Sequence, residues 1–154
     1  MAIKQHNIKL LNESAQMGFG AELAREVSAG LVVALYGDLG SGKSTLVRGV
    51  LRGAGFSGRV PSPTFTLMEI YETVQPRLCH LDLYRLSDMA ELELLGIRDY
   101  MDGNWTLWVE WPQRAPELAQ RADLDIHLDY DGDGRIVNLT GRTAQGAAVV
   151  EALQ

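Results

Sequence analysis

One glycine-rich segment of the chain matches the phosphate-binding loop pattern G-x-x-x-x-G-K-[ST] at every fixed position. The pattern is filled, in order, by Gly37, Asp38, Leu39, Gly40, Ser41, Gly42, Lys43 and Ser44. An apolar run over residues 31–36 precedes it, and a helix-compatible stretch over 45–51 follows it. A glycine-rich turn that contains a lysine by chance would not need a strand before it and a helix after it. The sequence therefore predicts a strand, a phosphate-binding loop and a helix, in this order.

The residue types in this loop fit the binding of a Mg²⁺-nucleotide. Glycines let the backbone curl, so that successive N–H groups point at phosphate oxygens. The start of the next helix adds unpaired donors and the positive end of its dipole. Lys43 supplies a positive charge for the β- and γ-phosphates, and the Ser44 hydroxyl is placed to ligate Mg²⁺.

Length and charge narrow the class of protein. A chain of 154 residues is expected to form a single domain, over 1–154. Its net charge of −6 makes it a poor candidate for gripping nucleic acid alone, because phosphate contacts dominate such binding. The single cysteine, Cys79, excludes an internal disulfide and suits a reducing compartment. No signal core and no apolar run of roughly 20 residues is visible, so we expect a cytoplasmic protein.

The hydrophobic pattern predicts alternating strands and helices. Strands are expected over residues 3–11, 31–36, 65–71, 77–84, 106–110, 124–130 and 135–139. Helices are expected after the N-cap residues Asn12 and Asp88 and after the glycine-rich loop. The strands at 65–71 and 77–84 could form a hairpin, as could the last two, and the chain from about Thr143 looks like a weak terminal element. The sum predicts an α/β, P-loop NTPase-like three-layer domain with a mixed parallel and antiparallel sheet.

Two carboxylates follow apolar strands downstream of the loop. Asp82 follows the run 78–81, and Glu110 follows the run 107–109. Ligand sites of α/β folds gather at strand ends, so we expect both residues near the loop. Either could hold the metal, directly or through water, while the other orients the attacking water. In isolation, each would more often be a surface carboxylate.

A short hydroxyl-bearing segment, Ser62-Pro63-Thr64, lies between the helix after the loop and the next strand. Nucleotide-sensing loops often occupy this place, so Thr64 could contact the γ-phosphate or Mg²⁺. A turn stiffened by the proline is an equally good interpretation.

Four segments in this order and spacing resemble the TsaE family, the ATPase component of bacterial tRNA threonylcarbamoyladenosine synthesis. They are the phosphate loop, Ser62-Pro63-Thr64-Phe65-Thr66-Leu67, His80-Leu81-Asp82-Leu83-Tyr84-Arg85-Leu86 and Val109-Glu110-Trp111-Pro112. The resemblance spans about residues 10–135. The phosphate loop alone is generic, whereas its combination with the other three segments is specific.

The resemblance implies a small P-loop ATPase that uses ATP and Mg²⁺. Such a protein works with a two-protein complex that transfers a threonylcarbamoyl group to an adenosine beside the tRNA anticodon. ATP hydrolysis would reset or sustain turnover rather than perform the transfer. The implied partners are therefore the proteins of the transferase complex, with tRNA only indirectly involved. The acidic charge is consistent with joining the assembly through protein contacts.

The resemblance also implies roles for individual residues. Ser44 and Glu110 would ligate Mg²⁺, and Asp82 would position water, beside the phosphate-binding Lys43. Thr45 would support the phosphate cradle, and Trp111 would act beside the site through nucleotide stacking or partner contact. Nucleotide contacts are further implied for Glu13 and Arg135. The last two lie in segments without a firm motif. Ser44 stands where a threonine is commoner in the family and keeps the hydroxyl.

Two other functions remain open at this point. A small-molecule kinase would need an arginine-bearing lid, for which Arg48, Arg52 and Arg59 are weak candidates, and no lid-like insertion is visible. In a non-hydrolytic nucleotide-gated binding module, Asp82 and Glu110 would merely support structure. An N-K-x-D segment typical of guanine recognition does not occur, which favours ATP. His80 next to Cys79 is interpreted as core packing, because adjacent strand residues point to opposite faces.

Overall fold

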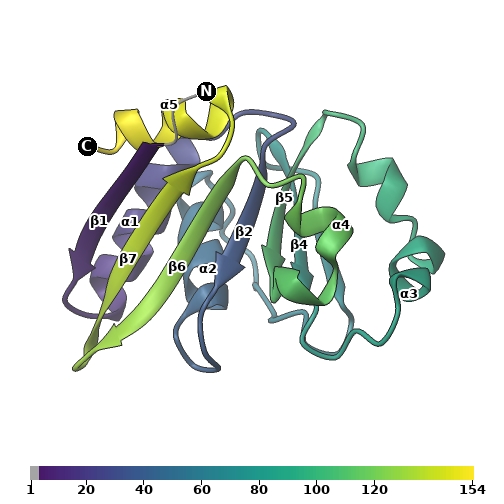
Figure 1. The fold of residues 1–154 in the computed structure, drawn as a ribbon, viewed down its shortest axis with the longest axis horizontal. Helices are drawn as coiled ribbons and strands as arrows, with labels where there is room; N and C mark the ends of the chain where they lie inside the picture. The colour runs from purple at the N-terminus through teal and green to yellow at the C-terminus, as the bar shows by residue number, and fades with distance from the viewer. Residues whose placement is uncertain (1–3) are drawn as a thin grey trace.

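The computed structural model describes residues 4–154, in which a seven-stranded sheet carries helices on both faces (Figure 1). The strands are β1 (Lys4–Leu10), β2 (Val32–Tyr36), β3 (Met68–Tyr71), β4 (Arg77–Asp82), β5 (Trp105–Glu110), β6 (Leu124–Asp131) and β7 (Gly134–Gly141). The helices are α1 (Glu13–Glu26), α2 (Lys43–Gly53), α3 (Met89–Leu94), α4 (Pro116–Ala119) and α5 (Ala144–Ala152), with 3₁₀ turns η1 (Ile97–Tyr100) and η2 (Pro112–Arg114). Ile3, where the expected first strand begins, lies outside the described residues.

The strands lie in the order β1-β7-β6-β2-β5-β4-β3. Four adjacent strands, β6, β2, β5 and β4, run parallel. β1, β7 and β3 pair antiparallel with their neighbours, which confirms both predicted hairpins and the mixed sheet. Because β2, β4 and β5 are parallel, their carboxyl ends meet at one edge of the sheet.

Two clusters of apolar side chains hold the layers together. The larger cluster packs α1, α2 and α5 against one face of the sheet, through residues such as Leu23, Leu46 and Val150. A smaller cluster joins α3, η1 and α4 to the other face of β4 and β5, where Leu81 and Leu107 are buried. Within residues 4–154, no helix is long and apolar enough to cross a membrane.

Helices α1 and α2 approach closely because glycines lie at their contact. A Cβ atom on Gly20 would lie 2.6 Å from the Leu46 carbonyl oxygen, and one on Gly49 would lie 2.5 Å from that of Met17. Both distances are too short for any other residue type without a shift of backbone. This close packing brings the first turn of α1 beside the start of α2.

The third strand was expected to begin at residue 65, and this start is wrong. The chain forms a turn here, the Leu67 N–H donates to the Pro63 carbonyl over 2.9 Å, and β3 begins at Met68. Leu67 has a φ of 67°, which removes it from the extended region that a strand requires. The alternation of Phe65 and Leu67 therefore does not reflect two faces of a sheet. The next strand likewise ends earlier than expected, at Asp82.

The carboxyl-terminal segment is better ordered than expected. Thr143 caps α5 by accepting a hydrogen bond from the Gly146 N–H over 3.2 Å. Val149 and Val150 are buried, and α5 packs on β7 and β1. The alanine- and glycine-rich composition of this helix gives a weak periodic signal, although its packing is specific.

Candidate functional site

The phosphate-loop segment connects the carboxyl end of β2 with α2, so that Lys43 is the first residue of the helix. Gly40 and Gly42 have φ values of 79° and 100°, which glycine adopts without steric cost. A cavity of about 290 Å³ lies beside the loop. It is lined by Leu39, Gly40, Gly42, Lys43, Ser44, Thr45, Ser62, Thr64, Asp82, Glu110 and Trp111. The topology thus brings all four of the segments that carry the family resemblance to one opening.

The Lys43 ammonium group is held at the mouth of the loop. Its Nζ donates to the Gly37 and Asp38 carbonyl oxygens over 2.5 and 3.1 Å, and lies 4.5 Å from the centre of the Trp111 ring. Burial lowers the pKa of Lys43, while the carboxylates of Glu110, Asp82 and Asp38 oppose this shift. The charge is therefore already positioned over the cavity by backbone carbonyls and an aromatic face.

Glu110 receives two hydrogen bonds on the same oxygen. The Ser44 hydroxyl donates to Glu110 Oε2 over 2.7 Å, and His80 Nε2 lies 2.6 Å from it. Glu110 is 4% exposed and His80 is fully buried. The hydroxyl and the carboxylate that the sequence points to as metal ligands are therefore direct neighbours.

Asp82 lies beside Glu110, because the parallel register of β4 and β5 pairs these two residues. The Tyr84 N–H donates to Asp82 Oδ1 over 3.1 Å, and the Thr64 hydroxyl donates to Oδ2 over 3.3 Å. Burial raises the pKa of Asp82, and the neighbouring Glu110 raises it further, whereas the bonds from Tyr84 and Thr64 and the nearby His80 lower it. The net result is a carboxyl group that holds a proton more readily than a solvated aspartate.

The hydroxyl-bearing turn reaches both carboxylates. Ser62 Oγ lies 2.9 Å from Thr64 Oγ1 and 3.3 Å from Ser44 Oγ. Together with the Thr64–Asp82 bond, these contacts form a chain of hydroxyl groups from the start of α2 to the end of β4. The turn is thus part of the cavity wall as well as being stiffened by Pro63.

Trp111 has an unusual backbone conformation for a bulky residue. Its φ is 57°, in the left-handed region, directly after Glu110. Its ring lies 5.0 Å from that of Tyr84 and below the Lys43 ammonium group. Such strain is usually maintained by the surrounding structure at functional sites.

Other side chains hold the loop from outside the cavity. Arg135 Nε donates to the Ser41 carbonyl over 2.8 Å and its Nη2 to that of Gly40 over 3.1 Å. Gln16 Nε2 donates to the Gly42 carbonyl over 2.7 Å. Glu13 lies in the first turn of α1, and neither it nor Arg135 is among the described residues that line the cavity.

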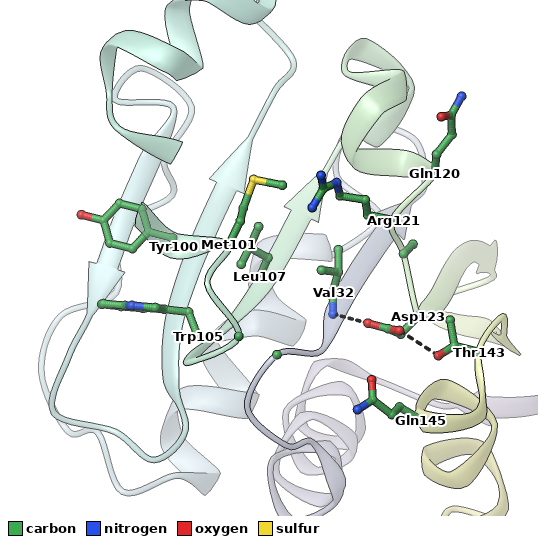
Figure 2. Close-up of a pocket in the computed structure, with 13 residues that line it drawn as sticks. Val32, Tyr100, Met101, Trp105, Leu107, Gln120, Arg121, Asp123, Thr143 and Gln145 are labelled. Carbon is green, nitrogen blue, oxygen red and sulfur yellow. Dashed lines mark hydrogen bonds between the residues drawn. The ribbon is translucent and has the colours of Figure 1, made fainter. Parts of the chain in front are cut away.

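A second cavity, of about 390 Å³, lies where β2 and β5 begin, near Val32 and Trp105 (Figure 2). The phosphate loop follows the other end of β2. Asp123 at the wall of this second cavity accepts hydrogen bonds from the Val32 N–H over 2.9 Å and from the Thr143 hydroxyl over 2.7 Å. Both carboxylate oxygens are thereby satisfied, and Asp123 joins the start of β2 to the start of α5. The residues predicted for the nucleotide site do not line this cavity.

Two residues at the phosphate-loop site were not predicted from the sequence to lie there. Gln16 appears only as a buried position of α1, and His80 was interpreted as core packing. His80 and Cys79 do face opposite sides of the sheet, but His80 faces Glu110. The H-x-D spacing on β4, which places His80 and Asp82 on one face, is the sequence signal that could have identified it.

Comparison with known proteins identifies relatives over most of the chain. A family model described as "Threonylcarbamoyl adenosine biosynthesis protein TsaE" matches residues 10–137. The tRNA threonylcarbamoyladenosine biosynthesis protein TsaE of Haemophilus influenzae is 38% identical over 92% of this chain and 92% of its own. The protein of the same name from Bacillus subtilis is 34% identical over 85% of this chain and 82% of its own.

A solved structure supports the fold. YdiB from Bacillus subtilis matches with a TM-score of 0.78 over 99% of this chain and 96% of its own, at 24% sequence identity. This similarity confirms the predicted P-loop NTPase-like α/β fold, and the sequence matches confirm the predicted family. The chain is therefore a member of the TsaE family, whose curated relatives are named for tRNA threonylcarbamoyladenosine biosynthesis.

Proposed function

We propose that this chain binds and hydrolyses Mg²⁺-ATP as a subunit required for threonylcarbamoyladenosine modification of tRNA. It acts with a partner transferase complex rather than performing the transfer itself. The observation that carries the proposal is the convergence of Lys43, Ser44, Asp82 and Glu110 on one cavity beside the phosphate loop. Family membership supplies the pathway, and the cavity supplies the chemistry.

The residues at the mouth of the cavity fit a magnesium ion. Ser44 Oγ and Glu110 Oε2 are hard oxygen ligands held 2.7 Å apart, of the kind that Mg²⁺ prefers together with phosphate oxygens and water. When bound, the ion would neutralise charge on the phosphates and on the leaving group. Ser44 and Glu110 would hold it, which is the assignment that the family resemblance also implies.

The remaining residues bind the phosphates and position the attacking water. The backbone N–H groups of residues 37–43 surround the phosphates, and Lys43 exchanges its carbonyl partners for phosphate oxygens. Asp82, whose raised pKa suits it to accept a proton, orients the attacking water. Thr64, bonded to Asp82, contacts the γ-phosphate side of the site.

We assign further nucleotide contacts to Thr45, Trp111, Arg135 and Glu13. Trp111 offers an aromatic face beside the phosphates, and Arg135 keeps the loop in its curled form through the Ser41 and Gly40 carbonyls. The kinase alternative loses one of its candidate residues. Arg52 donates to the Phe56 and Gly58 carbonyls over 2.8 and 2.6 Å and so stabilises the connection after α2.

Nucleotide binding and hydrolysis test separate parts of the proposal. Lys43→Ala is expected to weaken ATP affinity at least about tenfold, because a buried charge that pairs with phosphate is lost. Asp82→Ala is expected to keep ATP affinity within a few-fold and to lower partner-stimulated hydrolysis by about 100-fold or more. Isothermal titration calorimetry and phosphate release measure the two. Unchanged affinity in Lys43→Ala contradicts the site, and unchanged hydrolysis in Asp82→Ala contradicts the role of Asp82 in orienting water. Absence of partner-stimulated hydrolysis in the wild type favours the non-hydrolytic module.

Partner binding is tested by co-purification. The tagged protein, with and without ATP, is expected to retain proteins of the transferase complex under at least one nucleotide condition. Recovery of no tRNA-modification protein under either condition contradicts the proposed role. Phosphorylation of a small metabolite without phosphate release would instead favour the kinase.

A further inference from the structure

His80 is a fully buried polar side chain in the middle of β4. On the same face of the sheet lie Asp82, two residues along the strand, and Glu110 at the end of the neighbouring β5. Among residues 4–154, the ring has one hydrogen-bond partner, Glu110, whose Oε2 lies 2.6 Å from His80 Nε2. Because a carboxylate can only accept, the ring donates from Nε2.

The other ring nitrogen shows that this position is not optimised for stability. Nδ1 of His80 is buried and has no hydrogen-bond partner among the described residues. A buried polar atom without a partner is unfavourable, and an apolar side chain at this position would leave none. The ring is thus retained at a cost, and its one satisfied contact is with the carboxylate of the site.

We propose that His80 is a positioning residue, which fixes the Glu110 carboxylate in the orientation needed to bind Mg²⁺. This role rests on the proposed function. In the structure, Glu110 Oε2 is held from two sides, by His80 and by Ser44. The Ser44 hydroxyl is itself a proposed metal ligand, so its hydrogen bond to Glu110 is replaced when the metal site forms. The His80 hydrogen bond is then the protein contact that keeps Glu110 in place.

Hydrogen bonds from outside the ligand set generally affect metal affinity strongly. Loss of such a partner typically lowers metal affinity or activity by roughly 10–100-fold. His80 cannot reach the nucleotide itself, because it is fully buried and does not line the cavity. Its loss should therefore act on the Mg²⁺-dependent part of nucleotide binding and leave the metal-independent part unchanged.

The test compares the affinity for a non-hydrolysable ATP analogue with Mg²⁺ and with EDTA, by calorimetry. In His80→Leu the affinity in EDTA is expected to match that of the wild type, while the gain on adding Mg²⁺ falls roughly tenfold or more. His80→Gln, which keeps a donor near the position of Nε2, is expected to restore most of the gain. His6→Leu, on the edge strand β1, is the control for loss of a histidine and should behave as the wild type.

A double mutant distinguishes positioning from general damage. If His80 acts through Glu110, adding His80→Leu to Glu110→Ala should cause no further loss of the Mg²⁺-dependent gain. His80→Phe serves as a second donor-free variant if the leucine variant does not fold. The role of His80 is overturned if the donor-free variant keeps the full Mg²⁺-dependent gain in affinity, or if its affinity falls equally in EDTA. It is also overturned if His80→Gln does not restore the gain. Each of these results leaves the proposed metal site itself intact. A wild type without any Mg²⁺-dependent gain overturns the proposed metal site and this role with it.

Discussion

Asp82 shows how a single residue of the site opposes stability. It is 6% exposed and lies beside Glu110, and its pKa is raised above the ordinary value of 3.8. An acid with a raised folded-state pKa costs stability when it is ionised, and the cost disappears as the pH falls through that pKa. Asp82→Asn should therefore stabilise the free protein at pH 7.5, by roughly 0.5–2 kcal/mol. The Tyr84 N–H keeps an acceptor in the asparagine side chain.

Urea unfolding at several pH values measures this effect. The stability difference between Asp82→Asn and the wild type should shrink toward zero as the pH approaches 4. Asp88→Asn is a matched control, since it removes the same charge from an exposed N-cap where asparagine caps equally well. If Asp82→Asn is less stable than the wild type at pH 7.5, the hydrogen bonds to the carboxylate outweigh the cost of burying its charge.

Site residues differed in how far the sequence could predict them. Lys43 and Ser44 belong to a contiguous motif, so local spacing was sufficient to predict that they share the cavity. Asp82 and Glu110 were predicted to lie near the loop because ligand sites of α/β folds gather at strand ends. The contact between His80 and Glu110 depends on the register of β4 against β5, which no local pattern contains. The left-handed backbone of Trp111 likewise depends on its tertiary surroundings.

At the scale of elements, the contact between α1 and α2 positions the phosphate loop. It brings the Gln16 side chain of α1 within hydrogen-bond distance of the Gly42 carbonyl at the start of α2. Gly20→Ala would place a methyl group 2.6 Å from the Leu46 carbonyl oxygen, so the helices must separate. We expect a loss of about 1–3 kcal/mol in stability and a weaker affinity for Mg²⁺-ATP. Chemical denaturation and calorimetry measure the two quantities.

The same helix provides the control for this prediction. A Cβ atom on Gly18 meets nothing within 4 Å, so Gly18→Ala should change affinity little and gain up to about 1 kcal/mol from helix propensity. Equal stability of the two variants would contradict the packing argument.

Contacts between helices also limit sequence-based prediction, because the pattern of α1 predicts a helix but not the helix against which it packs. For the same reason the turn at 63–67, with its left-handed Leu67, was mistaken for the start of a strand.

For the molecule as a whole, the proposed site draws on elements that are far apart in sequence. β2, α2, the turn at 63–67, β4 and β5 each contribute a wall of the cavity or hold one in place. The Asp82 N–H donates to the Leu67 carbonyl, and the Leu83 N–H donates to that of Glu110, so these walls are also bonded to one another. A ligand held by all of them should stabilise the fold as a unit.

Thermal unfolding tests this coupling between the site and the fold. Mg²⁺-ATP analogue at 100 times its Kd should stabilise the protein by about 2.7 kcal/mol, since it binds the folded state alone. For a domain of this size, that corresponds to a rise in Tm of roughly 5–10 °C. The rise should be smaller in EDTA, where no metal bridges the nucleotide to Ser44 and Glu110. It should also be about half as large or less in Lys43→Ala at the same concentration, because a tenfold weaker affinity leaves about 1.4 kcal/mol. An equal rise in Lys43→Ala would place the nucleotide elsewhere on the molecule.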